Sequence, residues 1–260
     1  MDAPAKHVVA VASGKGGVGK STVSLNIAVA LAQRDLRAAV LDADVYGPDI
    51  PVMVGLTRRT PATSWSLWRR GQAPLEPVER FGVKLMSVGF LLGEQQGFPW
   101  IEQTLPFAVR QLLDDVAWGE LDVLVLDLPP GTTELQRHVL EEVRLSGALL
   151  VVTPQDVAHL DAKKLISLLE ENEVPVLGAV ENMSAFVCPH CGEETEVFPR
   201  VLEGRSIWSL GVERLAKIPL DPRVARAGED GTPALVAAPD SAAAAAFRAS
   251  ADALLARLGS

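Results

Sequence analysis

The stretch Gly14-Lys15-Gly16-Gly17-Val18-Gly19-Lys20-Ser21 decides the fold of this 260-residue chain. It matches the pattern G-x-x-x-x-G-K-[ST], in which glycines let the backbone fold so that its N–H groups point at phosphate oxygens. A short β-branched apolar run, residues 7–13, precedes the loop, and residues 20–34 follow it with apolar side chains at helical spacing. Strand, glycine-rich loop and helix in this order predict a phosphate-binding loop at a helix N-terminus, where the helix dipole favours an anion.

The loop residues have distinct expected roles. Lys20 is expected to reach the terminal phosphates of a nucleotide, and the Ser21 hydroxyl to ligate Mg²⁺. The flanking strand and helix argue against a chance match in a glycine-rich turn. The nucleotide-binding residues predicted from this segment are Gly14, Lys15, Gly16, Gly17, Val18, Gly19, Lys20, Ser21 and Thr22.

Buried strands alternate with helices along the rest of the chain, which predicts an α/β fold with a mainly parallel sheet flanked by helices on both faces. The expected strands are residues 7–13, 38–41, 83–88, 121–126, 149–153, 174–180 and 215–218, and the expected helices are 20–34, 103–116, 134–145, 156–172 and 240–258. Residues 57–77 have no assignable regular structure, and the alanine run 242–246 is interpreted as helix filler. With no linker and no internal repeat, residues 1–260 are expected to form a single domain.

The composition excludes several classes of protein. Apolar residues make up 48% and charged residues 22% of the chain, so a full core can be buried. The net charge of −9 and the pI of about 5.0 argue against a general nucleic-acid binder and against attachment to anionic lipid. No apolar run reaches the roughly 18–20 residues of a membrane span, and residues 1–5 do not open a secretory signal. We therefore expect a cytoplasmic protein with no membrane or nucleic-acid partner.

Three carboxylates follow expected strands. Asp42 and Asp44 come after the second strand, and Asp127 ends the fourth. Because ligands bind outside the carboxyl ends of parallel strands, all three should lie on the side of the phosphate loop. Asp127 is expected to hold the Mg²⁺ water shell and Asp44 to orient the attacking water, while Asp42 either supports the metal shell or caps a turn. The turn at residues 128–132 is a candidate γ-phosphate switch.

The second chemical feature is the pair Cys188 and Cys191 in a C-x-x-C spacing. The sequence that follows is poor helix material, which argues against a thioredoxin-like dithiol. A structural zinc or an iron–sulfur cluster usually needs four ligands, mostly thiolates, and one chain offers only two. A twofold dimer would bring four sulfurs together.

The loop variant K-G-G-x-G-K-[ST] resembles that of the dimerising P-loop ATPases of the MinD/ParA/ArsA/nitrogenase-iron-protein superfamily. Within it, the chain resembles the Mrp/ApbC-type iron–sulfur carrier ATPases. The matching segments are residues 14–22, 41–51 (LDADVYGPDIP), 84–92 (KLMSVGFLL), 118–133 (WGELDVLVLDLPPGTT), 181–192 (ENMSAFVCPHCG) and 218–222 (IPLDP). The resemblance implies a P-loop NTPase fold with a C-x-x-C insertion near residues 183–200.

The resemblance also implies roles for single residues. Lys15 is expected to contact phosphate across a dimer interface, which together with Lys20, Asp44 and Asp127 gives the catalytic set, and Asn182 to recognise adenine. Cys188 and Cys191 of two subunits are expected to bridge a [4Fe–4S] cluster. The homodimer would bind and slowly hydrolyse ATP, receive the cluster from a donor and pass it to apo iron–sulfur proteins.

Three departures from the family pattern bear on cluster geometry, hydrolysis rate and partner choice. Residues 100–103 read WIEQ where W-R-G-P is frequent, residues 198–204 read FPRVLEG in place of a glycine-rich run, and Thr133-Glu134 replaces Gly-Asp. Two alternatives stay open. One is a positioning ATPase of the MinD or ParA sort, and the other is the same ATPase with a structural zinc bridging the dimer, because four thiolates accept either metal.

Overall fold

The computed structural model describes residues 4–56, 74–91, 105–188 and 190–259. Nine strands of this part of the chain form one sheet in the order β3-β4-β2-β5-β1-β6-β7-β8, with β9 paired to β7. The strands are β1 (His7–Ala12), β2 (Ala38–Asp42), β3 (Val78–Arg80), β4 (Val83–Ser87), β5 (Val123–Asp127), β6 (Gly147–Val152), β7 (Val176–Val187), β8 (Glu194–Thr195) and β9 (Arg214–Leu220).

The sheet is parallel except at its two ends. β3 pairs antiparallel with β4, and β8 pairs antiparallel with the end of β7. Central strands such as β5, with the sequence VLVLD, are buried along their whole length, as expected when both faces of a parallel sheet are covered. In register, Val11 lies beside Asp127 and Asp42 beside Asp127, so the loop after β1 and both carboxylates meet at one edge of the sheet.

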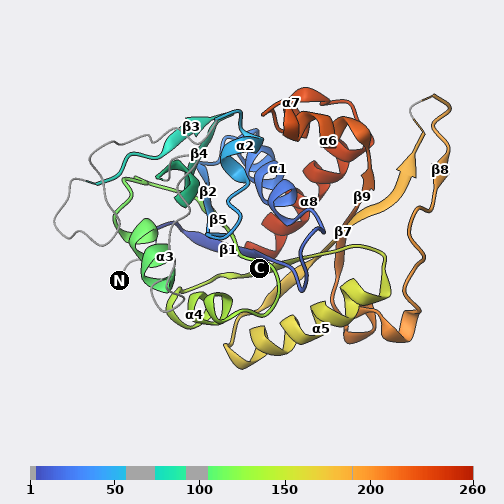
Figure 1. Ribbon diagram of the computed structural model, residues 1–260, viewed down its shortest axis with the longest axis horizontal. Helices are drawn as coiled ribbons and strands as arrows, with labels where there is room; N and C mark the ends of the chain where they lie inside the picture. The colour runs from blue at the N-terminus through green and yellow to red at the C-terminus, as the bar shows by residue number, and fades with distance from the viewer. Residues whose placement is uncertain (1–3, 57–73, 92–104, 189, 260) are drawn as a thin grey trace.

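Helices cover both faces (Figure 1). One layer contains α1 (Lys20–Ala32), α2 (Ile50–Met53), α6 (Pro222–Glu229), α7 (Ala234–Ala237) and α8 (Ala242–Leu258), and the other contains α3 (Leu105–Asp114), α4 (Glu134–Glu142) and α5 (Asp156–Glu171). Helix α1 is buried on most of its sides because α8 packs on it. Ala243 and Ala244 of the alanine run are fully buried, so the run brings α8 close to its neighbours as well as favouring helix.

The predicted α/β architecture is confirmed, with two differences in strands. β7 continues from the predicted residues 174–180 to Val187 and so leads directly into Cys188. The short strands β3 and β8 were not predicted. Of the segment 57–77, residues 57–73 lie outside the described residues, and so does the departure at 100–103. The single-domain organisation stays a prediction.

β7 and β8 carry a projecting hairpin, residues 186–202, which we call the cysteine arm (Figure 1). Only two residue pairs join its strands, Phe186 with Thr195 and Val187 with Glu194. The cysteine pair lies between these strands at the tip. Within the described part of the chain, no helix is both long and apolar enough to cross a bilayer.

Candidate nucleotide site and cysteine pair

The phosphate loop depends on glycine at three places. Gly17 and Gly19 have φ values of 78° and 82°, in the left-handed region where a side chain is strained. A Cβ on Gly19 would also lie 2.3 Å from Nδ2 of Asn182, and a Cβ on Gly14 would lie 2.3 Å from the backbone carbon of Asp161 in α5. The loop is therefore packed between α5 on one side and β7 on the other.

Lys20 lies in the first turn of α1 and forms a buried ion pair. Its Nζ is 2.9 Å from Oδ1 of Asp127, with side chains 7% and 0% exposed, and Ser24 donates a 2.6 Å hydrogen bond to the same oxygen. Lys20 also donates to Ser21 Oγ at 3.3 Å. A phosphate would have to draw the ammonium away from this carboxylate.

The second oxygen of Asp127 is a candidate ligand for a cation. Asp127 Oδ2 is buried and has no hydrogen-bond partner among the described residues. A buried carboxylate oxygen without a donor carries a free-energy cost that a metal-bound water or a cation would remove. With the hydroxyl of Ser21 nearby on α1, the donor set is of the oxygen type that Mg²⁺ prefers.

Asp42 closes the loop after β2. Its Oδ1 accepts from the backbone N–H of Asp44 at 3.1 Å, and its Oδ2 accepts from the Ser87 hydroxyl at 3.0 Å and the Ile50 N–H at 3.4 Å. Burial, with the charge of Asp127 beside it, raises the pKa of Asp42 well above its usual range. Of the two roles left open for Asp42, these contacts favour the turn cap.

Asp44 lies beyond that turn, half-buried, with its carboxylate accepting from the N–H of Gly47 at 3.2 Å. Burial raises the pKa of Asp44, while Lys20 opposes the shift. A carboxylate with a raised pKa is a better proton acceptor than an ordinary aspartate, which suits a group that orients a water.

Lys15 does not contact the other charged groups of the site. Its Nζ donates to Oε1 of Gln155, 3.3 Å away at the start of α5, and Thr153 donates to the same oxygen at 3.3 Å. Gln155 was not predicted as a site residue, because a glutamine 140 residues away along the chain gives no local signal.

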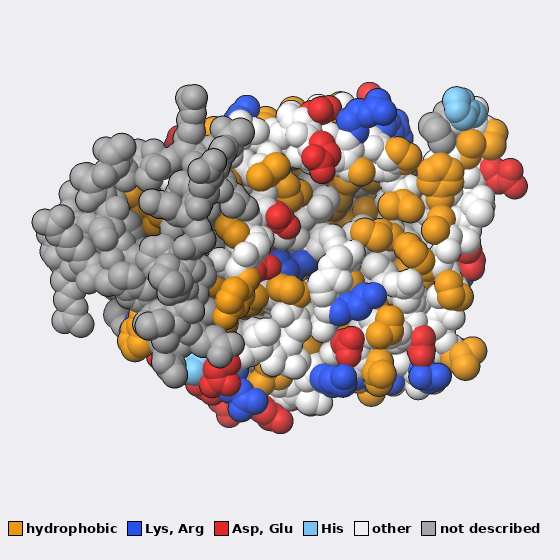
Figure 2. Space-filling view, in the orientation of Figure 1, with side chains coloured by type: hydrophobic (Ala, Val, Ile, Leu, Met, Phe, Trp, Pro, Cys, Tyr) orange, Lys and Arg blue, Asp and Glu red, His pale blue; other side chains and the backbone are white. Residues whose placement is uncertain are grey.

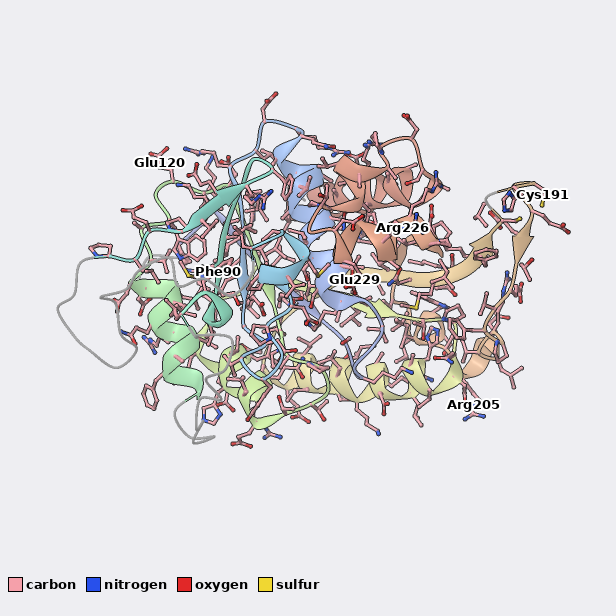
Figure 3. The ribbon with its side chains drawn as sticks, turned by 45° about the horizontal axis from the view of Figure 1, so that its top comes forward. Phe90, Glu120, Cys191, Arg205, Arg226 and Glu229 are labelled. Atoms are coloured by element: carbon pink, nitrogen blue, oxygen red, sulfur yellow. The ribbon has the colours of Figure 1, made fainter. Side chains whose placement is uncertain are left out.

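A cavity of about 360 Å³ opens beside the loop. It is lined by Gly19 of the loop, by Asn182 of β7, and by side chains of α2 and α6, among them Val52, Met53 and Val224. Asn182 Nδ2 donates one of its two N–H bonds to the Val18 carbonyl oxygen at 2.8 Å, so Oδ1 and the second N–H remain for a ligand in the cavity. Glu229, the last residue of α6, also lines this cavity and is labelled in Figure 3.

The cysteine pair lies in a turn at the tip of the cysteine arm, where Figure 3 shows Cys191 far from Glu229. Both thiols are free, with Cys188 half-buried and Cys191 exposed. The backbone N–H groups of Cys191 and His190 lower the pKa of the Cys188 thiol. The backbone closes the turn through Gly192 N–H to Cys188 O at 2.9 Å, with Gly192 at φ 75°.

The structure thus brings the predicted residues into two groups. Lys20, Ser21, Asp44 and Asp127 meet at one edge of the sheet with Asn182 beside the loop, while the cysteines lie apart on the arm. No cluster of three or more His, Cys, Asp or Glu suited to a metal exists among the described residues. Ser24, the second donor to Asp127, was missed, although its spacing of four from Lys20 on one helix was a usable signal.

Comparisons with known proteins identify the family of this chain. Residues 4–255 match the family model ParA, described as NUBPL iron-transfer P-loop NTPase. The "Iron-sulfur protein required for NADH dehydrogenase, mitochondrial" of Arabidopsis thaliana is 40% identical over 244 residues, covering 94% of this chain and 76% of that protein. The "Iron-sulfur cluster carrier protein" of Helicobacter pylori is 42% identical over 242 residues, and this chain spans 93% of its own length but 64% of that protein's.

Solved structures give the same fold. A nucleotide-binding protein from Archaeoglobus fulgidus in complex with ADP aligns with a TM-score of 0.75 at 35% identity, covering 92% of this chain and 90% of that one. The cell division ATPase MinD from Pyrococcus furiosus aligns with a TM-score of 0.71 at 22% identity, covering 96% and 99%, which concerns the fold alone. The chain belongs to the ParA family of P-loop NTPases, in the group described as NUBPL iron-transfer P-loop NTPases.

Proposed function

We propose that this protein is an ATP-dependent iron–sulfur cluster carrier, in which two copies hold one [4Fe–4S] cluster between their cysteine arms and deliver it to apo-proteins. The observation that carries the proposal is the turn at Cys188–Cys191. It presents two thiols at an exposed tip, lowers the pKa of one of them through backbone N–H groups, and offers no further ligand in the described part of the chain.

Two thiolates per chain call for a second copy. A cluster of four irons takes four thiolates, and a twofold axis through the cluster would supply two from each subunit. Exposed apolar side chains lie at the base of the arm, namely Val157 and Leu160 on α5 and Leu202 at the end of the arm itself. Figure 2 shows hydrophobic side chains gathered over the β7 and arm side of this face. Such a surface is typical of a protein contact.

The nucleotide part of the proposal follows from the loop. On ATP binding, Lys20 exchanges Asp127 for phosphate oxygens, and the freed carboxylate then serves the metal shell together with Ser21. Mg²⁺, when bound, neutralises charge on the phosphates. Asp44 orients the attacking water. Lys15, supplied by the partner copy, stabilises the charge that develops on the transferred group.

The Asn182 amide can pair with adenine in the cavity. One of its two Nδ2–H bonds donates to the Val18 carbonyl oxygen, which leaves Oδ1 as an acceptor and the second N–H as a donor. Oδ1 can accept from the 6-amino group of adenine while the second N–H donates to a ring nitrogen. We propose ATP as the nucleotide on this pairing.

The test is metal and sulfide analysis after anaerobic reconstitution, with and without ATP. We expect about four irons and four sulfides per dimer, a broad visible absorption, and loss of both in Cys188→Ser and in Cys191→Ser. Lys20→Ala, with its folding checked by circular dichroism because it breaks the buried pair with Asp127, serves as the control and should lose ATP binding while keeping the iron. Unchanged iron uptake in the double cysteine variant contradicts the proposal, and one zinc per dimer in place of iron identifies the structural zinc alternative.

A further inference from the structure

The start of helix α5 holds the side chain of Lys15. Gln155 is the residue directly before the helix, and its side-chain oxygen accepts from Lys15 Nζ and from the Thr153 hydroxyl, both at 3.3 Å. The loop backbone at Gly14 is packed against the backbone of the same helix, with no space for a Cβ. The loop and α5 are thus one packed unit, and the Lys15 side chain is fastened to it by Gln155.

The two sequence neighbours of Gln155, Pro154 and Asp156, contact the end of the cysteine arm and the segment that follows it. The N–H of Val201, in the return segment of the arm, donates to the Pro154 carbonyl oxygen at 2.8 Å. Arg205, which follows the arm, forms an ion pair with Asp156 at 2.7 Å. Figure 3 shows Arg205 beside the end of α5 that faces the arm. Three consecutive residues, 154–156, therefore contact both the phosphate-loop lysine and the base of the arm.

A buried contact one turn further on fixes this junction. His159 of α5 is fully buried, and its Nδ1 accepts from the N–H of Ile207 at 3.3 Å. Its ring meets Trp208 edge to face with centroids 5.4 Å apart, and Arg214 of β9 lies 4.7 Å over the Trp208 ring. The segment after the arm cannot slide along α5 without breaking the buried contact of His159 with Ile207, so movement of the α5 entry passes to the arm.

We propose that residues 154–156, the α5 entry turn, relay the state of the nucleotide site to the cysteine arm, with Gln155 as a positioning residue. Gln155 holds Lys15 back until the lysine engages a phosphate of the partner copy. Its release frees the entry turn to shift, and Pro154 and Asp156 carry the shift to the arm and so to the grip on the cluster. The inference rests on the proposed function, because it needs the dimer and the cluster. If nucleotide-driven dimerisation changes the affinity for the cluster by a given factor, then by linkage a bound cluster changes the affinity of that dimerisation by the same factor.

The Lys15 part is tested on metal-free protein by sedimentation with a non-hydrolysable ATP analogue. Removing the hydrogen bond in Gln155→Ala should lower the protein concentration of half-dimerisation roughly 2- to 10-fold. Gln155→Glu should raise it, because a carboxylate holds the ammonium more strongly. Gln33→Ala, at the end of α1, is the control and should change nothing. An unchanged or raised midpoint in Gln155→Ala overturns the inference. A wild-type protein that stays monomeric overturns the proposed function itself.

The arm part is tested by the rate at which a chelator removes iron from reconstituted protein, with and without the analogue. Arg205→Gln breaks the ion pair to α5. It should bring the ratio of the iron-removal rates with and without the analogue closer to one, by up to roughly fivefold. Arg200→Gln is the matched control, because its partner Glu196 lies within the arm and the two arginines are 61% and 59% exposed. Equal ratios in the two variants, or a wild-type ratio of one, overturn the relay. A protein that takes up no iron overturns the carrier proposal instead.

Discussion

Replacing Lys20 by methionine should destabilise the nucleotide-free protein by about 3–5 kcal/mol, because it leaves a buried carboxylate without its cation. The Lys20 ammonium lies 2.9 Å from the Asp127 carboxylate, and both side chains are almost fully buried. After the substitution, the Ser24 hydroxyl is the donor that remains, and the neighbouring Asp42 repels the Asp127 charge.

The magnitude follows from the geometry. At 2.9 Å and an effective dielectric constant of about 20, the attraction is about 6 kcal/mol, against a desolvation cost of several kcal/mol for each ion. The intact pair therefore contributes a net free energy of folding close to zero, whereas removing one of its two charges is strongly destabilising. The double variant Lys20→Met with Asp127→Leu removes both charges and should recover most of the loss.

Thermal and urea unfolding without nucleotide measure the effect. A loss of this size corresponds to a fall of roughly 6–20 °C in Tm. Lys6→Met is the matched control, because Lys6 pairs with Asp122 at 2.8 Å but is 67% exposed, and it should cost about 0–1 kcal/mol. If Lys20→Met costs no more than Lys6→Met, the ion pair does not exist in the nucleotide-free protein, and the exchange of partners on ATP binding is wrong.

Three further predictions concern the loop, the arm and hydrolysis. Gly19→Ala should weaken binding of a fluorescent ATP analogue far more than Gly17→Ala. Both glycines have a positive φ, but only the Cβ added at position 19 meets Asn182, at 2.3 Å, so equal losses would point to backbone strain alone. Alkylation of Cys188 by iodoacetamide should reach half its maximal rate at a pH below the usual thiol pKa of 9.0, and a midpoint at or above that value would count against the N–H contacts. The ATPase rate should fall as the pH drops through the raised pKa of Asp44, above the 3.8 of an ordinary aspartate, and Asp44→Asn should remove this limb; an acid limb that persists in the variant assigns it to another group.

Much of the sheet could be predicted from sequence because its central strands are continuous apolar runs. β5 is buried along its whole length and β1 from Val8 onward, as such runs demand. β8 has only two residues, both exposed, so no periodicity marks it. The extension of β7 beyond residue 180 was missed because Glu181 and Asn182 look like the end of a buried strand, whereas an ion pair of Glu181 with Arg214 and the contact of Asn182 with the loop keep them in place.

The site divides in the same way. The phosphate loop is local, since eight consecutive residues carry its chemistry. The contacts that surround it are long-range and depend on how elements pack. Gln155 reaches Lys15 across 140 residues, and Ser87 reaches Asp42 across 45. Neither contact leaves a pattern in the chain, so the partners of the predicted residues had to come from the structure.

Strand β7 separates two kinds of chemistry in space. Cys188 at the tip follows Asn182 at the nucleotide cavity by six positions, which at about 3.3 Å per residue is a reach of up to roughly 20 Å. In the proposed carrier, hydrolysis would release protons at the cavity end of β7, and the acid-sensitive sulfides would be carried at the tip. A recipient protein would then take up the cluster at the tip, away from the nucleotide site.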